Sequence, residues 1–387
     1  SYGHLTDPEG TGAVTADPTP ATNARESRLP RSLRILGAFV ALSVLLFAVR
    51  HHKRSQKQAA IERIEELGGF FDSRLVDLPW PIDQLASTIG KNPPSKIFGV
   101  TLGETATTDE DLRHVNRLGD LRWVSLNDTR ITDAGVQQLS GQNELRQLSL
   151  QNSDVINPDL RGFTELMQLG LSHTQVDDVG LQTVARLVNL TWLDISNTPV
   201  TDSGLQHLSG LVDLELLNAS HTRIRGPGLD YLRQLPSLRD LSLNGEYVDD
   251  ATLRYLGGFP QLQRLHLLDT RITDSGLQHL GTLSNLEYLG LNGTQITDLG
   301  PQHLSALPRL KRLDLTGTQI TDGALQDLGM LTTLESLTVS ETQVTDAGLH
   351  HLRTLTSLEY IDLTDTGVTA SGANELRRLL PNCQIQR

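Results

Sequence analysis

A motif of the form I-T-D-x-G-L-x-x-L-x-x-L runs through most of this sequence and constrains its fold more than any other feature. Copies begin at Thr107, Ile131 and Val155, which are evenly spaced, and the next interval is shorter. Self-similarity at a fixed period, typically of about 20–50 residues, indicates a repeat architecture. Nine copies then keep the original spacing, at Val176, Val200, Ile224, Val248, Ile272, Ile296, Ile320, Val344 and Val368.

Each unit divides into two halves with different periodicities. The half that reads L-x-x-L-x-L-x-x-T has apolar residues two apart, as at Leu265 and Leu267, which is the period of a strand. In the other half apolar residues lie three apart, as at Leu277, Leu280 and Leu283, which is the spacing of a short helix. Such a unit is too small to fold alone, so stability must come from stacking on its neighbours, and both ends need a cover.

These residues resemble the leucine-rich repeat family over residues 97–387, in particular bacterial members with 24-residue repeats that carry Thr where other subfamilies have Asn or Cys. The resemblance implies an α/β fold, a leucine-rich repeat solenoid of about 12 strand–helix repeats, with a parallel sheet on the concave face and helices outside. The layout of the chain is similar to that of bacterial single-pass membrane-anchored leucine-rich repeat proteins.

The first quarter of the chain differs in composition from the repeats. Residues 1–32 hold four prolines and few apolar residues, which predicts a disordered N-terminal tail. Uncharged Ile35–Val49, flanked by Arg34 and Arg50, predicts a transmembrane anchor over 33–50, although a signal peptide or a soluble helix also fits so short a stretch. A membrane-proximal helix over 51–69 and an N-terminal cap of the solenoid over 70–96 follow, before the leucine-rich repeat domain at 97–387.

The anchor does not reveal which side of the membrane carries the solenoid. Within twenty residues, four Lys and Arg side chains precede the apolar stretch and five follow it. The positive-inside rule needs a larger difference than this. We therefore predict a single-pass membrane protein and leave its topology open.

Charge and cysteine content exclude several functions. Residues 1–96 carry 12 basic and 10 acidic side chains, so residues 97–387 carry 21 basic and 36 acidic ones and a net charge of −15. An acidic body repels the phosphate backbone, so we expect no nucleic-acid partner. The single cysteine, Cys383, excludes a disulfide framework and a thiolate metal cage.

Polar residues that recur once per repeat have structural interpretations. A column of aspartates that includes Asp250 and Asp274 predicts N-caps of the convex helices, with a cation-binding edge as the alternative. A column of threonines that includes Thr270 is expected to bond backbone groups of the turn. We expect no metal and no cofactor. Since no catalytic motif occurs either, we predict that the protein is not an enzyme.

The outward positions of the strands are where the repeat does not dictate residue type, and there variety is informative. Aromatic residues and arginine, which protein interfaces enrich, lie at several of these positions. The sequence therefore predicts a partner-binding site on the concave face, formed by Trp123, Trp192, Leu216, Asp240, Arg264, His266, Leu268, Tyr288, Arg312 and Tyr360.

We accordingly predict a membrane-tethered binding module whose concave face recognises a protein or an envelope polymer of unknown identity. The alternative is a structural envelope component without a specific ligand. Two adjacent departures from the pattern, at Arg225-Gly226-Pro227 and at Glu246-Tyr247, are interpreted as one local feature.

Overall fold

The computed structural model describes residues 31–75 and 95–387, with the side chains of residues 39–72 and 97–387. The chain divides into two compact units, Ser1–Ser55 and Gln56–Arg387. Nearly all of the predicted disordered tail, and most of the predicted cap at 70–96, lie outside the described residues.

The first described element is one continuous helix, α1 (Arg31–Glu66), which runs through both the predicted anchor and the predicted membrane-proximal helix. It ends before Gly68, whose φ of 85° is a conformation that glycine adopts without strain. Among the residues that the structure describes, no helix is both long and apolar enough to cross a membrane.

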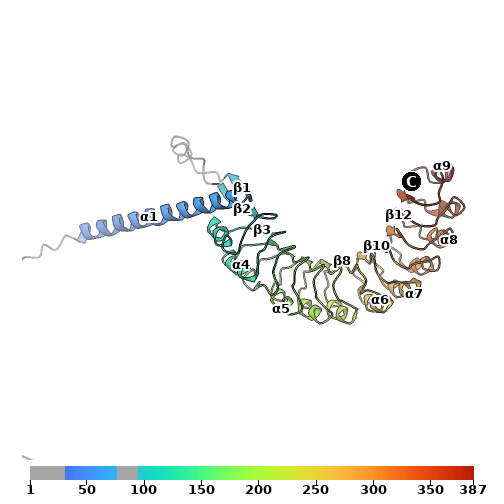
Figure 1. Ribbon diagram of the computed structural model, residues 1–387, viewed down its shortest axis with the longest axis horizontal. Coiled ribbons are helices and arrows are strands. Elements are labelled where there is room, and N and C mark those ends of the chain that lie inside the picture. Colours follow the sequence, from blue (N-terminus) through green and yellow to red (C-terminus); the bar gives the residue numbers. More distant parts are fainter. Residues whose placement is uncertain (1–30, 76–94) are drawn as a thin grey trace, which may run out of the picture. The chain divides into compact units, whose positions relative to one another are not determined.

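A single sheet of 14 strands runs through residues 70–387, with the strands in sequence order (Figure 1). Its first strand, β1 (Phe70–Leu75), pairs antiparallel with β2 (Ser95–Thr101), and all later pairs are parallel. The remaining strands are β3 (Trp123–Ser125), β4 (Gln147–Ser149), β5 (Gln168–Gly170), β6 (Trp192–Asp194), β7 (Leu216–Asn218), β8 (Asp240–Ser242), β9 (Arg264–His266), β10 (Tyr288–Gly290), β11 (Arg312–Asp314), β12 (Ser336–Thr338), β13 (Tyr360–Asp362) and β14 (Gln384–Gln386).

The register of the sheet follows the repeat period. Tyr288 pairs with Arg264 on one side and with Arg312 on the other, so each residue pairs with its equivalent one repeat away. Where the sequence repeat shortens, Gln147 pairs with Gln168, and the sheet stays in register because the missing residues come from the convex side. The predicted solenoid with a parallel sheet is thus confirmed, with β1 and β14 as additional strands at its ends.

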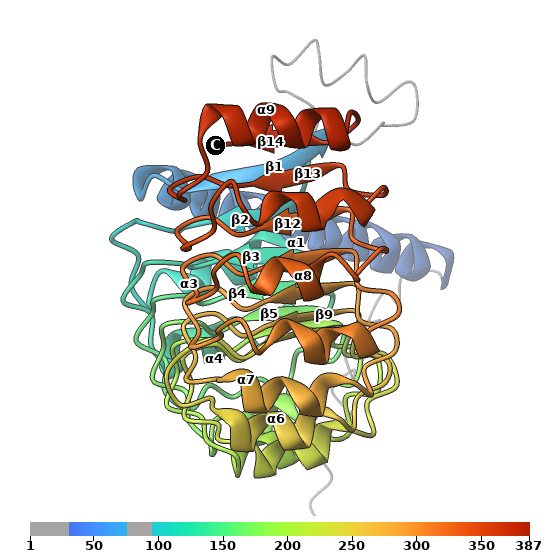
Figure 2. The same ribbon diagram turned by 90° about the vertical axis from the view of Figure 1, so that its right-hand side faces the viewer.

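The second half of most units forms a short helix on the outer side, as Figures 1 and 2 show, whereas the short unit between β4 and β5 forms none. About half of these segments are 3-10 rather than α-helices, since a coil of this length has room for only one or two turns and several begin with proline or glycine. They are α3 (Leu112–Val115), η1 (Asn116–Leu118), α4 (Asp133–Gln138), α5 (Leu181–Val184), η2 (Gly204–Leu208), η3 (Pro227–Leu232), α6 (Asp250–Leu256), α7 (Asp274–Leu277), η4 (Gln278–Leu280), η5 (Pro301–Ala306), α8 (Ala324–Leu328), η6 (Leu349–Thr354) and α9 (Ala370–Leu379).

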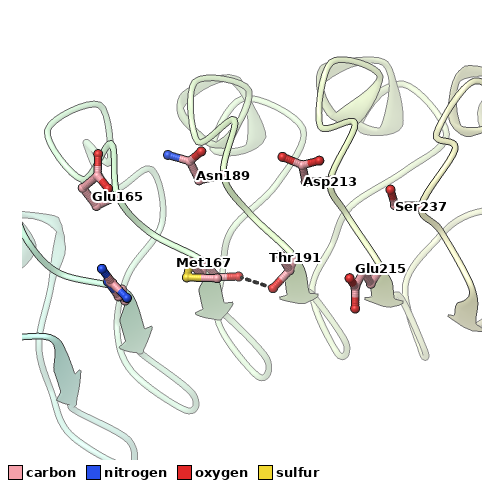
Figure 3. Close-up of a pocket in the computed structure, with 8 residues that line it drawn as sticks. Glu165, Met167, Asn189, Thr191, Asp213, Glu215 and Ser237 are labelled. Carbon is pink, nitrogen blue, oxygen red and sulfur yellow. Dashed lines mark hydrogen bonds between the residues drawn. The ribbon is translucent and has the colours of Figure 1, made fainter.

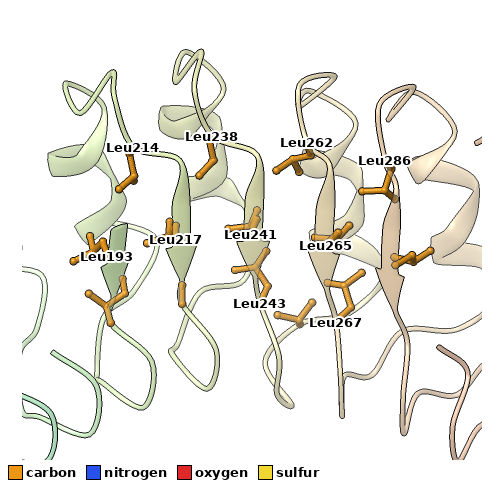
Figure 4. Packing of buried hydrophobic residues seen from close by; sticks show 14 of the residues in the cluster. Leu193, Leu214, Leu217, Leu238, Leu241, Leu243, Leu262, Leu265, Leu267 and Leu286 are labelled. Atoms are coloured by element: carbon orange, nitrogen blue, oxygen red, sulfur yellow. The ribbon is translucent and has the colours of Figure 1, made fainter. Parts of the chain in front are cut away.

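The core is a continuous column of leucines between the sheet and the helices (Figure 4). Leu241, Leu265 and Leu289 occupy the same place in consecutive coils and are fully buried. Each coil therefore hides its apolar side chains against the next one, and stability is shared between neighbours rather than contained in one unit.

The ends of this column are covered by local structure. At the start, Ala60 and Ile64 of α1 join the core, so the helix that was predicted to be membrane-proximal also caps the repeats. A side chain on Gly69 would lie 2.7 Å from atoms of Ile64 and Leu102, which explains the glycine at this junction. At the other end Leu380 is buried, whereas the neighbouring Leu379 is 40% exposed.

The aspartate column links successive coils and does not cap helices of its own coil, which corrects the sequence interpretation. Asp274 accepts hydrogen bonds from the backbone N–H and the hydroxyl of Thr297, at 2.8 and 2.6 Å, and Asp250 binds Thr273 in the same way. The caps that do form come from other residues, as where Thr132 accepts from the Ala134 N–H. We call this feature the Asp–Thr ladder; it comprises the pairs Asp109–Thr132, Asp178–Thr201, Asp250–Thr273, Asp274–Thr297, Asp298–Thr321, Asp322–Thr345 and Asp346–Thr369.

The recurring glycine exists because of this ladder. A Cβ on Gly300 would lie 2.7 Å from Oδ1 of Asp274, and one on Gly348 would lie 2.6 Å from Oδ1 of Asp322. Only a residue without a side chain leaves the aspartate of the preceding coil in place. The glycine column therefore marks the close approach of neighbouring coils.

The threonine column acts within each turn, as predicted. The hydroxyl of Thr270 donates to the carbonyl oxygen of Leu267 at 2.8 Å, and Thr318 bonds Leu315 at 2.7 Å in the next but one coil. Both threonines are buried, so these bonds satisfy a backbone carbonyl that water does not reach.

Candidate binding surface

The predicted site residues all lie on one face of the sheet. Eight of them are the first residue of a strand, from Trp123 in β3 to Tyr360 in β13, and the parallel register aligns them in a single row. His266 is the last residue of β9, and Leu268 lies two positions beyond it. Side chains alternate along a strand, so the leucine between two of these positions points into the core and the row points outward.

Three members of the row and His266 come together around β8, β9 and β10. The guanidinium Nε of Arg264 lies 2.6 Å from Oδ2 of Asp240, and Nε2 of His266 lies 3.6 Å from the other oxygen of that carboxylate. The rings of His266 and Tyr288 are in contact, with centroids 4.7 Å apart. We call Asp240, Arg264, His266 and Tyr288 the central cluster.

The sequence predicts that Asp240 contacts the partner, and its position in the structure does not fit this role. It is only 6% exposed, because Arg264 and His266 cover its carboxylate. It therefore cannot meet a partner directly in this arrangement. Its effect is to hold the charged end of Arg264, which itself is exposed, in one place on the surface.

Burial changes the titration of two members of the central cluster. It lowers the pKa of His266; the nearby carboxylate of Asp240 opposes this shift, and the guanidinium of Arg264 adds to it. Burial also raises the pKa of Tyr288, and the charges of Asp314 and Asp240 act in the same direction. At neutral pH both side chains therefore present neutral hydrogen-bonding groups beside a fixed positive charge.

The sequence did not single out Asn292 and Asp314, which lie next to the central cluster. The side-chain amide of Asn292 donates to Oδ2 of Asp314 at 2.6 Å, while its buried Oδ1 has no hydrogen-bond partner among the residues that the structure describes. Their positions in the coil were visible in the repeat, since Asn292 lies two residues after the end of β10 and Asp314 is the last residue of β11. What the pattern lacked was any indication that these two would face each other.

The remaining predicted residues are spread along the row. Leu216 and Trp192 lie on the strands that precede the central cluster, and both are half-buried. Trp123 lies far along the sheet on β3, where its indole ring occupies the space above Gly99 and would overlap a side chain there. Tyr360 lies at the other end, on β13, and donates a hydrogen bond of 3.0 Å to Gln386. The sequence thus placed the row correctly but could not tell which members touch.

A shallow groove runs along the edge where the chain enters the strands. One part, with a volume of ≈ 370 Å³, lies over β4–β8 (Figure 3). Figure 3 shows Met167, Thr191 and Glu215 at the strand entries and Glu165, Asn189, Asp213 and Ser237 in the loops above them. A second part, of ≈ 300 Å³, shares Arg146 and Met167 with the first and extends to Phe98 and Trp123.

The two departures from the repeat form one local feature, as the sequence suggested. The guanidinium carbon of Arg225 lies 5.4 Å from the centre of the Tyr247 ring. Gly226 has a φ of 126° and lies against Tyr255 of the next coil, 2.6 Å from where its Cβ would be. The coil in which Arg225 and Gly226 replace the Thr and Asp of the motif therefore contacts the Tyr247 ring of the next coil.

No group of three or more His, Cys, Asp or Glu side chains that could hold a metal occurs among the described residues.

Comparison with known proteins supports the repeat assignment. A family model described as a leucine-rich repeat region matches residues 249–381. Among solved structures, an internalin from Listeria monocytogenes is 20% identical and covers 81% of this chain and 98% of its own, with a TM-score of 0.55. A leucine-rich repeat protein from Leptospira interrogans is 20% identical over 81% of this chain and 93% of its own, with a TM-score of 0.43.

At these identities the structural likeness shows the fold alone. No curated protein gives a significant sequence match. Leucine-rich repeat solenoids generally mediate protein–protein interactions and offer an extended concave surface for them. Residues 249–381 thus match the leucine-rich repeat family model, and the same coil continues back to β2, so the chain has the fold of a leucine-rich repeat solenoid.

Proposed function

We propose that this protein is a non-enzymatic binding module that recognises a protein, or an envelope polymer, through the concave face of its solenoid. The central cluster carries the proposal. There an exposed arginine is fixed by a buried carboxylate, beside a tyrosine and a histidine whose rings are in tilted contact. Side chains that are already ordered lose little entropy on binding, so such an array suits recognition.

The charge arrangement suits recognition of a partner. Asp240 is covered, and the pKa values of His266 and Tyr288 move in the directions that keep both neutral. Arginine and aromatic side chains in a well-packed patch are typical of residues that dominate the energy of protein interfaces. We expect binding energy to concentrate in Arg264, Tyr288 and Trp192.

Photo-crosslinking tests the location of the interface. A photoreactive phenylalanine at exposed Arg312, beside the central cluster, is expected to crosslink the partner in cells of the source organism. The same residue at exposed Gln278, on the convex η4, is the control and should not. The triple variant Trp192→Ala, Tyr288→Ala, Arg264→Ala should remain folded and lose the crosslink at Arg312. Equal crosslinking from both faces, or crosslinks only to a second copy of the chain, would favour the structural envelope role.

Tethering of the solenoid to a membrane by residues 33–50 is part of the same proposal. It is supported by the apolar side chains of α1, since Phe39, Leu45 and Phe47 are 65, 60 and 71% exposed. Exposed apolar surface of this extent marks contact with a membrane or a protein. Replacing Leu45 and Leu46 by Asp should release the protein from membranes after alkaline extraction. Met330→Asp, at an exposed apolar residue of the solenoid, should leave it bound.

A further inference from the structure

The strand-entry edge of β2–β5 contains a pocket that the central cluster does not use. It has a volume of ≈ 300 Å³ and is lined by Phe98, Arg122, Trp123, Arg146 and Met167, together with Asp72, Gln147 and Gln168. The register places it several strands away from Arg264. We call it the Arg122–Arg146 pocket.

The backbone places the two arginines next to each other. The N–H of Arg146 donates to the carbonyl of Arg122 at 2.7 Å, and the N–H of Arg122 donates to that of Phe98 at the same distance. Neighbouring strands of a sheet lie about 4.8 Å apart. Two positive charges therefore start from adjacent strands on the same edge, an arrangement that costs stability unless water or an anion lies between them.

Neither arginine forms an ion pair with a carboxylate of the described residues. Elsewhere on the same face, Arg264 pairs with Asp240 at 2.6 Å and Lys311 pairs with Glu287 at 3.2 Å. Asp72 lines the pocket and Glu165 lines the groove beyond it, but neither forms an ion pair with either arginine. Both guanidinium groups are exposed, so they can bind an incoming carboxylate.

The neutral residues around the arginines are apolar or already satisfied. The Arg122 guanidinium carbon lies 5.2 Å from the centre of the Phe98 ring, and the Trp123 indole lies above Gly99. Met167 is 40% exposed at the far side. The amides of Gln147 and Gln168 hydrogen-bond each other. The pocket thus combines two cations and the single carboxylate of Asp72 with an apolar and aromatic surface, and its lining has a net positive charge.

The whole repeat domain is acidic, and this does not cancel the local charge. In physiological salt, exposed charges are screened beyond about 8 Å, so an incoming group responds mainly to the side chains that line the pocket. Beyond Met167 the same groove becomes acidic, with Glu165, Asp213 and Glu215. A long run of acidic residues would meet repulsion there, whereas a short one fits.

We propose that the Arg122–Arg146 pocket binds a short acidic segment of a protein partner, in which an Asp or Glu side chain lies next to an apolar or aromatic one. The carboxylate lies between the two guanidinium groups, and its apolar neighbour packs on Trp123 and Met167. This inference rests on the proposed function, because it specifies one of the contacts by which the concave side recognises its partner.

A random heptapeptide library displayed on phage, selected on the full-length protein, tests the proposal. Enriched peptides are expected to contain Asp or Glu beside Leu, Phe, Tyr or Trp, and their synthetic versions should bind more weakly as salt rises. The variant Arg122→Gln, Arg146→Gln should weaken these peptides by roughly tenfold or more, since it removes charge-assisted hydrogen bonds. Its matched control, Arg254→Gln, Arg353→Gln, removes the same charge from the convex α6 and η6 and should leave affinity unchanged.

The outcomes separate this inference from the proposed function. Selection without enrichment of acidic residues, or peptides that bind the Arg122→Gln, Arg146→Gln variant as tightly as the wild type, overturns the pocket. If such peptides instead lose affinity in the Trp192→Ala, Tyr288→Ala, Arg264→Ala variant, the concave face binds and only the pocket is wrong. Both glutamine variants replace exposed side chains, and circular dichroism verifies that they remain folded.

Discussion

The Asp–Thr ladder and the outward row of the sheet repeat with the same period, yet they use it in opposite ways. Along the ladder, residue types are nearly constant, because each aspartate must meet a threonine and a glycine of the neighbouring coil. Along the outward row they change from one strand to the next, from Leu216 to Asp240 to Arg264. A column is constant where its partner is the chain itself, and variable where the fold requires no partner.

The largest effect is expected from filling the space that the ladder occupies. In Gly348→Ala the new Cβ would lie 2.6 Å from Oδ1 of Asp322 and 2.7 Å from Cδ1 of Leu325. The φ of Gly348 is −80°, which alanine adopts freely, so the cost is steric and should be about 2–3 kcal/mol of unfolding free energy.

Thermal unfolding, with hydrogen exchange of the flanking coils, measures this cost. Gly210→Ala is the control, because nothing lies within 4 Å of its Cβ position and its φ is not positive. That variant should be neutral or slightly more stable. Equal stability of the two variants would show that the glycine column has another cause.

Removing one carboxylate of the ladder should have the next largest effect. Asp274→Ala leaves the N–H and the hydroxyl of Thr297 without the acceptor that they now share. Since these groups are partly buried, we expect a loss of about 2 kcal/mol, measured by denaturant unfolding. Asp213→Ala removes an exposed aspartate for which no hydrogen bond is recorded, and it should change stability little. A loss in Asp213→Ala as large as that in Asp274→Ala would point to net charge as the cause.

Removing one hydroxyl of the threonine column should cost less unfolding free energy, because its hydrogen bond lies within a single turn. Thr270→Val keeps the shape of a side chain that is 3% exposed but removes the hydroxyl that bonds the Leu267 carbonyl. We expect about 1 kcal/mol from this single neutral hydrogen bond. Thr332→Val, at an exposed threonine, is the matched control and should not change the unfolding free energy. If Thr270→Val does not lower the unfolding free energy either, water replaces the hydroxyl.

Features that depend on the period alone could be predicted from the sequence. The columns that contain Leu265, Thr270 and Arg264 each fix where a side chain lies in the coil. In the structure Leu265 lies in the core, Thr270 in the turn and Arg264 on the concave face of the sheet. A repeat shows the position of a residue within its own coil because that position is the same in all coils.

Contacts between coils, and contacts at the ends, could not be predicted in this way. A column of aspartates looks the same whether Asp274 caps its own helix or binds Thr297 of the next coil, since the pattern is identical in both cases. The burial of Asp240 follows from two particular neighbours that occur once. Ile64 lies outside the repeat, so its place in the core had no periodic signal.

Acidification should reveal the contribution of the central cluster to stability. The pKa of His266 is lowered from 6.5, so in the range just below pH 6.5 the unfolded chain binds more protons than the folded one. Stability from this group is complete above that pH and is lost as the pH falls through the folded pKa. The melting temperature of His266→Gln should therefore depend less on pH between 7.5 and about 5 than that of the wild type.

His114 provides the comparison for this measurement. Burial, with Arg117 and Arg113, also lowers its pKa, so part of the acid sensitivity should persist in His266→Gln and disappear only when His114 is replaced as well. If His266→Gln has the same pH profile as the wild type, His266 is protonated equally easily in both states, and its contacts with Asp240 and Tyr288 do not affect folding.

The smallest effect on stability is expected for a residue of the outward row on which the fold does not depend. Arg312 is an exposed member of the outward row, and no ion pair is recorded for it among the described residues. Arg312→Ala should therefore change the unfolding free energy by no more than about 0.5 kcal/mol. The same variant should weaken binding of the partner at the central cluster. If Arg312→Ala leaves folding intact and reduces binding, the variable row serves to bind a partner. A clear loss of stability would instead show that Arg312 contributes to folding, as the Asp–Thr ladder does.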